Sequence, residues 1–241
     1  MKENKYDNNE FFEKYSQFPR SVDGLKAAGE WHELQRMLPD FRGKCVLDLG
    51  CGFGWHSRYA IEQGAESVVG VDISGKMLAE AAKKTNSNNI TYICSSIEDY
   101  EYPKEAFDMV ISSLVLHYIE SFGDVCAKVR ECLRIGGDFV FSVEHPIFTA
   151  QGKQEWVLNE SGELLHWPVD NYFFEGVRNT RFLGEDVLKY HKTLTTYVGD
   201  LIDHGFIITG VCEPIPTQEM LAEMPNELRR PMMLIISAKK I

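Results

Sequence analysis

The chain has 241 residues, a formal net charge of −11 at pH 7 and a hydrophobic content of 44%. This length suits one α/β domain, and the apolar content is sufficient for a complete core. The acidic balance argues against general attraction to nucleic-acid backbones or anionic membranes, because the basic residues form only scattered pairs. We therefore expect a small-molecule partner, no nucleic acid and no membrane.

The six cysteines contain no C-x-x-C pair, which disfavours a metal site or a redox motif. Their scattering through apolar segments is typical of a reducing compartment, so we expect a cytoplasmic protein. The polar start of the chain, residues 1–6, does not resemble a signal peptide. No apolar run reaches the ~20 residues that a membrane-spanning helix needs.

From residue 22 to residue 143, segments of helical spacing alternate with short apolar runs. The spacing predicts helices over 22–38, 56–63, 76–84 and 122–133. The apolar runs predict strands over 44–48, 67–71, 90–94, 107–112 and 138–143. Strands alternating with helices indicate an α/β fold with a Rossmann-like, doubly wound sheet.

The pattern changes at Pro146, where an aromatic and irregular segment begins. An insertion of this length is typical of a lid or cap. Beyond it we expect a helix over 193–204 and two strands that complete a mostly parallel seven-stranded sheet with an antiparallel edge strand. The expected single domain, 1–241, has a helical lid (1–40), a cofactor-binding core (41–145), a cap (146–191) and a C-terminal helix with two strands (192–241).

Three glycines, at positions 50, 52 and 54, follow the first predicted strand. Glycines at the carboxyl end of a parallel strand let a ligand approach the backbone closely. Asp72 ends the second strand, where a carboxylate can accept hydrogen bonds from both ribose hydroxyls of an adenosine. The dinucleotide fingerprint needs a small residue near the position of Trp55, so the spacing disfavours a dinucleotide.

Four segments carry a family resemblance: Val46–Gly54, Val69–Ser74, Phe107–Tyr118 and Leu133–Phe139. In this order they resemble the motifs of class I S-adenosylmethionine-dependent methyltransferases, in particular the small-molecule subgroup. The last segment departs from the family pattern, because Ile135-Gly136 replaces the usual Lys-Pro step.

The resemblance implies S-adenosylmethionine as cofactor and S-adenosylhomocysteine as product. Arg20 is expected to pair with the methionine carboxylate, and Ser96, which replaces a common acidic residue, to bind the adenine edge. The implied cofactor-binding residues are Tyr15, Arg20, Asp48, Gly50, Cys51, Gly52, Gly54, Trp55, Asp72, Ile73, Met77, Ser95, Ser96, Ile97 and Ser113.

Methyl transfer from a sulfonium is an in-line displacement that needs alignment and, for some acceptors, a general base. Candidate catalytic groups follow the fourth and fifth strands, namely His117, Glu144 and His145, and His191 follows the cap. For His117 a structural role is an equally open alternative, and for His191 a capping or packing role is the more usual one.

The sequence therefore predicts a methyltransferase that acts on O, N or C of a small, partly apolar acceptor. The aromatic cap would suit an acceptor pocket, a small core or the face of a homodimer. Two alternatives remain open at this point: a non-catalytic protein that binds S-adenosylmethionine or S-adenosylhomocysteine, and an oxidoreductase with a nucleotide cofactor.

Overall fold

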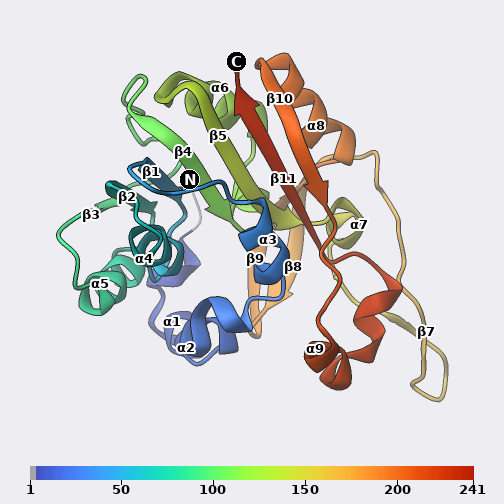
Figure 1. The fold of residues 1–241 in the computed structure, drawn as a ribbon. Helices are drawn as coiled ribbons and strands as arrows, with labels where there is room; N and C mark the ends of the chain where they lie inside the picture. Colours follow the sequence, from blue (N-terminus) through green and yellow to red (C-terminus); the bar gives the residue numbers. More distant parts are fainter. Residues whose placement is uncertain (1–3) are drawn as a thin grey trace.

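The computed structural model describes residues 4–241 and is built around a seven-stranded sheet (Figure 1). The strand order is β10-β11-β5-β4-β1-β2-β3. β11 is antiparallel to β5 and β10, and the remaining neighbours are parallel. The predicted fold class is thus confirmed. The strands are β1 (Cys45–Leu49), β2 (Ser67–Asp72), β3 (Ile90–Cys94), β4 (Phe107–Ser113), β5 (Leu133–Glu144), β10 (Phe206–Cys212) and β11 (Met233–Lys240).

Helices lie on both faces of this sheet, and three of them, α1 to α3, come before β1 in the chain. Residues 1–3 of the predicted N-terminal lid lie outside the described residues. The α-helices are α1 (Asn9–Ser16), α2 (Pro19–Asp23), α3 (Trp31–Met37), α4 (Trp55–Glu62), α5 (Gly75–Lys84), α6 (Phe122–Cys132), α7 (Pro146–Thr149), α8 (Leu194–Asp203) and α9 (Gln218–Glu223). Short 3-10 helices are η1 (Lys5–Asp7), η2 (Gly24–Ala27), η3 (Leu116–Tyr118) and η4 (Pro225–Arg229).

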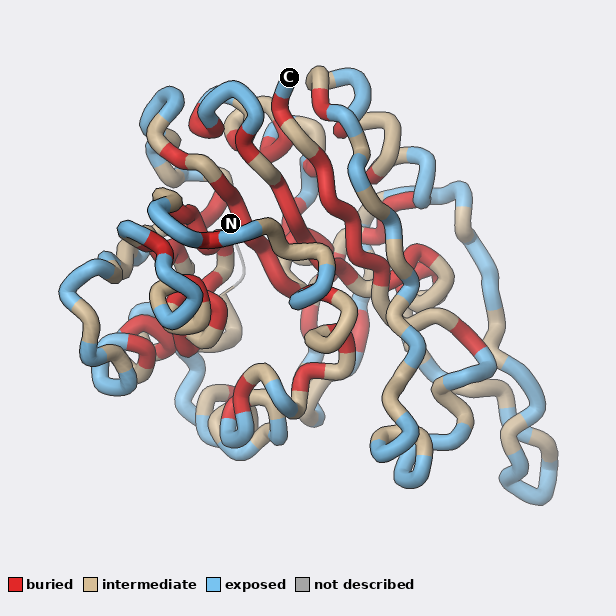
Figure 2. The backbone as a smooth tube through the Cα atoms, viewed as in Figure 1, coloured by how far each residue is buried: buried red, intermediate tan, exposed pale blue. Residues whose placement is uncertain are grey.

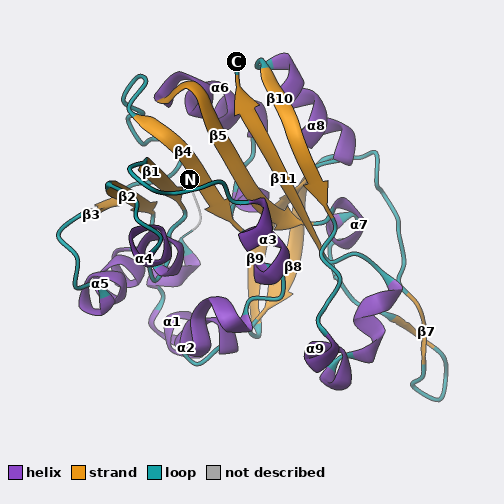
Figure 3. Cartoon of the chain, in the orientation of Figure 1, coloured by secondary structure: helices purple, strands orange, loops and turns teal. Residues whose placement is uncertain are grey.

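The core lies on both faces of the sheet, and the strands are its most buried parts (Figure 2). Because side chains alternate along a strand, Leu47 joins the cluster under α6 and α8, whereas Val46 joins the one under α4. α3 covers a third cluster, around Val140 and Ile235. Figure 3 shows the resulting helix-sheet-helix layering.

β1 is the point of the sheet from which the strand order runs in both directions, with β2 and β3 on one side and β4 and β5 on the other. This strand pairs with β2 on one side and with β4 on the other. In open α/β sheets, ligands bind beyond the carboxyl ends of the strands at such a switch point. The fold therefore places its ligand crevice beyond Leu49, Asp72 and Ser113, the last residues of these three strands.

The structure corrects two predicted elements. The helix expected over 22–38 is divided into the end of α2, η2 and α3. Gly24 has a φ of +64°, which a continuing α-helix does not allow, and a Cβ there would lie 2.6 Å from the Trp55 ring. β5 begins at Leu133, five positions before the predicted start.

The segment after Pro146 is more regular than predicted. It forms two hairpins, β6 (Val157–Leu158) with β7 (Leu164–His166), and β8 (Gly176–Phe182) with β9 (Glu185–His191). Leu183 and Gly184 connect β8 to β9, and both have positive φ angles, of 52° and 83°. Such a pair produces the tight turn whose twist matches that of the strands.

Candidate active site

The glycine turn is held against the end of β2. The backbone N–H groups of Gly50 and Cys51 donate to Val71 O at 2.7 and 3.0 Å. Gly50 has a φ of +72°, and a Cβ there would lie 2.3 Å from Val115 Cγ2. Gly54 adopts the left-handed conformation immediately before α4. Close contacts and positive φ angles together explain why glycine is needed in this turn.

Asp72 is joined directly to the turn. Its Oδ2 accepts the backbone N–H of Gly52 at 2.9 Å, and its Oδ1 accepts that of Ser74 at 2.9 Å. Burial nevertheless raises the pKa of Asp72 to about 6. Met77 lies below the turn, with its Cε 3.2 Å from the position of a Cβ on Gly52. Each carboxylate oxygen retains a lone pair with which it can accept a ribose hydroxyl.

Asp48 lies beneath the turn and is fully buried. Its Oδ2 accepts the hydroxyl of Ser57, on α4, at 2.6 Å. Burial raises the pKa of Asp48 to about 7. This carboxyl therefore fixes the helix that follows the turn, and its contact with the cofactor stays a prediction.

The loop after β3 differs in detail from the expectation. Ser95 N donates to the backbone carbonyl of Asp72 at 3.0 Å, which places the loop beside the residue whose carboxylate is expected to bind the ribose. The Ser96 hydroxyl donates to Asp99 at 2.8 Å and accepts the Asp99 N–H at 3.1 Å, so it closes a local turn. The Ile97 side chain packs in the main core. The Ser96 hydroxyl therefore has a structural role in this turn, and its contact with the adenine stays a prediction.

The segment before α1 crosses the end of β2. Asn4 Nδ2 donates to Ile73 O at 3.1 Å. Asp7 Oδ1 accepts the Ser74 hydroxyl at 2.6 Å and the Lys76 N–H at 3.1 Å, which ties the segment to the start of α5. These contacts come from residues that the sequence did not single out.

Two N-terminal tyrosines, Tyr6 in η1 and Tyr15 in α1, lie near Asp72. The rings of Tyr6 and Tyr15 meet edge to face at 5.0 Å. Tyr6 is hydrogen-bonded to Tyr118, in η3 after β4, and burial raises its pKa well above the ordinary value. Tyr6 and Tyr118 thus lie beside Tyr15, whose contact with the cofactor stays a prediction.

Arg20 takes part in a buried polar network. Its Nη1 lies 2.7 Å from Glu30 Oε1, and its Nη2 donates to Ser113 Oγ at 2.7 Å. Ser113 in turn donates to the same Glu30 oxygen at 3.0 Å. Arg20 and Ser113 therefore contact each other, and their predicted contacts with the cofactor stay predictions. Sequence reasoning did not anticipate that Glu30 neutralises the guanidinium.

His117 and Glu144 are adjacent beyond β4 and β5. His117 Nδ1 accepts the backbone N–H of Glu144 at 3.3 Å. Burial lowers the pKa of His117 to about 3, so the imidazole is neutral and its proton is on Nε2. In this tautomer Nε2 can donate a hydrogen bond, while Nδ1 is already occupied by the Glu144 N–H, so a role as general base stays a prediction.

The cap supplies a cation to this part of the cleft. Lys189, on β9, is buried and lies 2.6 Å from Glu144 Oε1, while Gln154 Nε2 donates to Glu144 Oε2 at 2.9 Å. Burial alone would raise the pKa of Glu144, but the charge and hydrogen bond of Lys189 and the hydrogen bond of Gln154 lower that pKa below its ordinary value. Glu144 is therefore ionised and paired.

The two remaining histidines have structural surroundings. His191 Nδ1 shares a 2.7 Å hydrogen bond with Thr149, and its Nε2 shares one of 2.8 Å with Tyr172 O. His145 Nδ1 accepts the Ile147 N–H at 3.1 Å and its Nε2 lies 2.8 Å from Glu213 Oε1. Both nitrogens of His191 are hydrogen-bonded within the protein, whereas His145 Nε2 lies close to Glu213 without a hydrogen bond, so the catalytic roles of these two histidines stay predictions.

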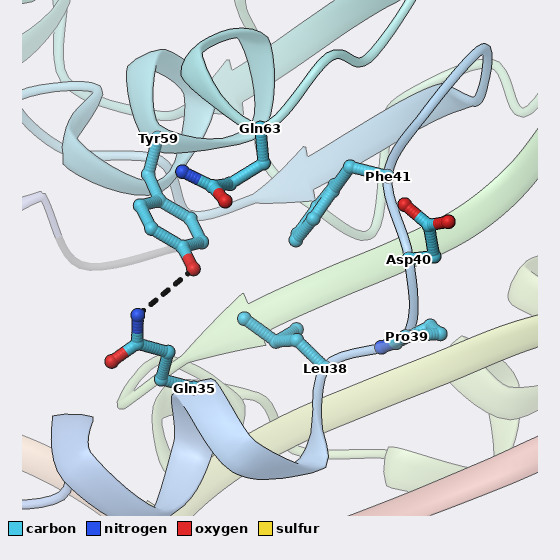
Figure 4. A pocket seen from close by; sticks show the side chains of 7 residues that line it. All are labelled: Gln35, Leu38, Pro39, Asp40, Phe41, Tyr59 and Gln63. Atoms are coloured by element: carbon cyan, nitrogen blue, oxygen red, sulfur yellow. Dashed lines mark hydrogen bonds between the residues drawn. The ribbon is translucent and has the colours of Figure 1, made fainter.

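Several buried polar atoms around the cleft have no hydrogen-bond partner within residues 4–241, namely Glu30 Oε2, Trp55 Nε1 and His56 Nε2. Buried polar groups of folded proteins are almost always satisfied. Their unused capacity, together with the glycine cradle and Asp72, fits a polar ligand that contains a ribose. Figure 4 shows a different feature, a shallow pocket lined by Leu38, Phe41 and Tyr59 near the opposite end of β1.

Within the described residues, no helix is long and apolar enough to span a bilayer. The same part of the chain contains no group of three or more histidine, cysteine or acidic side chains arranged to hold a metal ion.

The fold and the site together define a methyltransferase, and comparisons with known proteins agree. Residues 47–141 match a family described as "Methyltransferase domain". A Listeria monocytogenes crystal structure, provisionally named as an S-adenosylmethionine-dependent methyltransferase, is 56% identical with a TM-score of 0.85, over 89% of this chain and 99% of that one. An S-adenosylmethionine-dependent methyltransferase from Mesorhizobium loti is 42% identical with a TM-score of 0.84, over 90% and 100% of the chains.

The chain belongs to the class I S-adenosylmethionine-dependent methyltransferases, and its cofactor is S-adenosylmethionine. A Haemophilus influenzae protein named only as uncharacterised is 34% identical over 98% of this chain and 96% of its own length. The tRNA U34 carboxymethyltransferase of Shewanella frigidimarina is 33% identical over 66% of this chain, which spans 54% of that relative. The oxidoreductase alternative is thereby excluded.

Proposed function

We propose that the enzyme transfers the methyl group of S-adenosylmethionine to O, N or C of a small, partly apolar acceptor. The observation that carries this proposal is the packing of the N-terminal segment, residues 4–23, against the cap, residues 146–191, beside the crevice beyond β1, β2 and β4. Phe182, on β8, has its ring centroid 6.1 Å from that of Phe11 and 5.9 Å from that of Phe18. Lys14 adds an ion pair to Glu185 at 3.4 Å. An acceptor enclosed by these segments must be small.

The walls of this enclosure are aromatic and electrically balanced. Lys189 Nζ lies 6.0 Å from the Tyr118 ring centroid and 5.9 Å from that of Phe182, and its charge is matched by Glu144. A site with aromatic faces and a paired ion favours an uncharged, partly apolar molecule. It also favours transfer of a methyl group over transfer of a carboxymethyl group. Lys189 and Arg20 are already paired with Glu144 and Glu30, so neither remains free to bind the additional carboxylate of a carboxymethyl group.

The chain's own residues would then act mainly by positioning. When bound, the cofactor supplies an electrophilic methyl group on a sulfonium. Asp72 and the glycine turn hold the nucleoside, while His117 Nε2–H can donate to an acceptor oxygen or nitrogen and fix its orientation. The closed aromatic wall excludes water from the reacting atoms.

Transfer RNA is the competing acceptor class, since the tRNA U34 carboxymethyltransferases are relatives of part of this chain. The net charge of −11 opposes binding of a polyanion. The two classes can be separated by incubating the enzyme with S-adenosylmethionine and either bulk tRNA or a panel of small phenols, amines and carbon acids, with S-adenosylhomocysteine formation as the readout.

We expect turnover on one small-molecule group and none on tRNA. Glu144→Gln should lower that turnover by more than about tenfold, because it leaves Lys189 unpaired in the acceptor wall. Glu160→Gln, an exposed change in the same cap, should leave the turnover unchanged. Turnover on tRNA alone would contradict the proposed acceptor class.

A further inference from the structure

Three polar side chains from distant parts of the chain form a closed ring at the carboxyl end of β5. Glu144 ends β5, Gln154 lies in the loop after α7, and Lys189 lies on β9. Lys189 Nζ donates to Glu144 Oε1 at 2.6 Å and to Gln154 Oε1 at 3.2 Å, while Gln154 Nε2 donates to Glu144 Oε2 at 2.9 Å. Each oxygen of this carboxylate therefore has its own donor, and the cap supplies both donors.

Gln154 makes these contacts from an unfavourable backbone conformation. Its φ is +54°, a region that glycine and asparagine tolerate far better than other residues. An asparagine would be one methylene shorter, and a glutamate could not donate to Glu144. Only an amide can donate to a carboxylate and accept from an ammonium at the same time, and glutamine combines that group with the longer reach. Backbone strain that is retained for specific polar contacts points to a functional role for them.

The two donors of the ring have the chemistry of a carboxylate-binding site. Only 2% of the surface of Lys189 is exposed, so its ammonium is bound by protein groups and not by solvent. Because Gln154 Oε1 accepts from this ammonium, the amide is oriented with its NH₂ group toward the carboxylate. An ammonium and an amide N–H, one for each oxygen, make charge-assisted hydrogen bonds to a carboxylate. Glu144 is the carboxylate that occupies them.

We propose that Lys189 and Gln154 form a carboxylate-binding subsite of the acceptor site, that Glu144 fills this subsite, and that its occupancy excludes acidic acceptors. The location of the subsite in the acceptor site rests on the proposed function, whereas the subsite itself rests only on the contacts of these three side chains. The carboxylate of an acidic acceptor would lie unpaired beside that of Glu144, which is costly in a buried site. The enzyme should therefore select uncharged acceptors over their carboxylate analogues.

The first test supplies the missing carboxylate from solution. Glu144→Ala removes a fragment that corresponds to acetate and leaves both donors, Lys189 and Gln154, in place. Sodium acetate should raise the melting temperature of this variant in a saturable manner, by about 4 °C at a tenfold excess over the dissociation constant. Sodium chloride at the same concentration should not produce this rise, and the wild-type enzyme should respond equally to the two salts.

The control is a second glutamate–lysine pair with the same separation. Glu80 Oε1 lies 2.6 Å from Lys83 Nζ on α5, but this lysine is 70% exposed, so acetate should stabilise Glu80→Ala no more than chloride does. Two further substitutions in the Glu144→Ala background test the donors. Gln154→Met, which keeps the length of the side chain, should weaken acetate binding by about tenfold, and Lys189→Met should abolish it.

A second variant tests the exclusion of acidic acceptors and keeps the volume of the side chain. Glu144→Gln removes only the negative charge, so the charge of Lys189 is no longer balanced. Benzoate should therefore bind Glu144→Gln at least about tenfold more tightly than it binds wild type in ligand-detected NMR titrations. Benzamide, the uncharged analogue, should bind both proteins equally.

Each of these measurements can overturn the proposal. If Glu144→Ala responds to acetate no more than to chloride, or does not fold in either salt, the subsite is refuted. If benzoate has the same affinity for wild type and Glu144→Gln, or binds neither, the exclusion of acidic acceptors is refuted. Neither measurement needs an identified acceptor or any turnover, so these failures are distinct from a failure of the proposed methyl transfer.

Discussion

The backbone N–H of Gly52 donates to Asp72 Oδ2 at 2.9 Å, so the glycine turn after β1 and the carboxylate after β2 form one unit. Two motifs that are 20 residues apart in sequence are thereby fixed relative to each other before any ligand binds. Such preorganisation lowers the entropic cost of holding a nucleoside.

Gly50 should tolerate no side chain. In Gly50→Ala, the new Cβ would lie 2.3 Å from Val115 Cγ2 at a φ of +72°, so we expect a loss of at least about 2 kcal/mol in the free energy of unfolding. Adding Val115→Ala should recover part of that loss by removing the clash. Urea unfolding measures both effects. Gly75→Ala is the matched control, since a Cβ there meets nothing within 4 Å; equal loss in the two alanine variants would refute this account.

Asp48 should make stability depend on pH. Its pKa is raised to about 7 in the folded state, so the folded protein retains a proton that the unfolded chain releases. Its contribution is therefore present at low pH and disappears as pH rises from about 4 to 7, by at most about 4 kcal/mol.

His56 and His117 have the opposite effect on the pH dependence of stability. Their pKa values are lowered in the folded state, so their contribution to the free energy of unfolding is fully present above about pH 6.5. The informative quantity is thus the difference in unfolding free energy between wild type and Asp48→Asn. Measured by urea unfolding from pH 5 to pH 8, this difference should shift in favour of the variant as pH rises. A difference that stays constant across this range would contradict the buried, protonated Asp48.

His117 should remain neutral across the physiological range. Because Nδ1 accepts the Glu144 N–H and burial lowers the pKa to about 3, the ring should keep its proton on Nε2 from pH 5 to pH 8. Long-range ¹H–¹⁵N NMR spectra of the imidazole report both the tautomer and the titration. A midpoint near 6.5, or a proton on Nδ1, would restore His117 as a candidate base.

Asp7 should control how long the cofactor stays bound. It ties the N-terminal segment to α5 through the Ser74 hydroxyl and the Lys76 N–H. Asp7→Ala removes both contacts, so we expect dissociation of S-adenosylhomocysteine to accelerate by about tenfold in stopped-flow measurements. Glu13→Ala alters an exposed residue of the adjacent helix α1 and should have no such effect. An unchanged dissociation rate in Asp7→Ala would show that the segment does not cover the ligand.

The parts of the fold that could be predicted from sequence are those with strong local patterns. β1, β2 and β3 are short apolar runs, and the glycine spacing indicates a turn. Ser74 is a common capping residue and caps α5, where it accepts the Met77 N–H at 3.1 Å. Asp72 was identified because it ends such a run. These features depend on residues that are close together in the sequence, so local sequence motifs are sufficient to predict them.

The missed features depend on contacts between distant segments. The β8–β9 hairpin was not predicted because its turn, Leu183-Gly184, lacks the common Asn-Gly or Asp-Gly signature. Glu30 stood within a segment read as one helix, where an acidic residue is ordinarily solvated. Its burial follows from the break at Gly24 and from its pairing with Arg20, neither of which a local pattern reveals.

The central claim is that S-adenosylmethionine binds between the glycine turn and Asp72. Calorimetric titration of S-adenosylhomocysteine into wild type, Asp72→Ala and the surface control Asp40→Ala tests it most directly. We predict binding to wild type and to the control, and a loss on the order of a hundredfold in Asp72→Ala, since two charge-assisted hydrogen bonds to the ribose disappear. No binding to wild type, or equal affinity in Asp72→Ala, would contradict the claim.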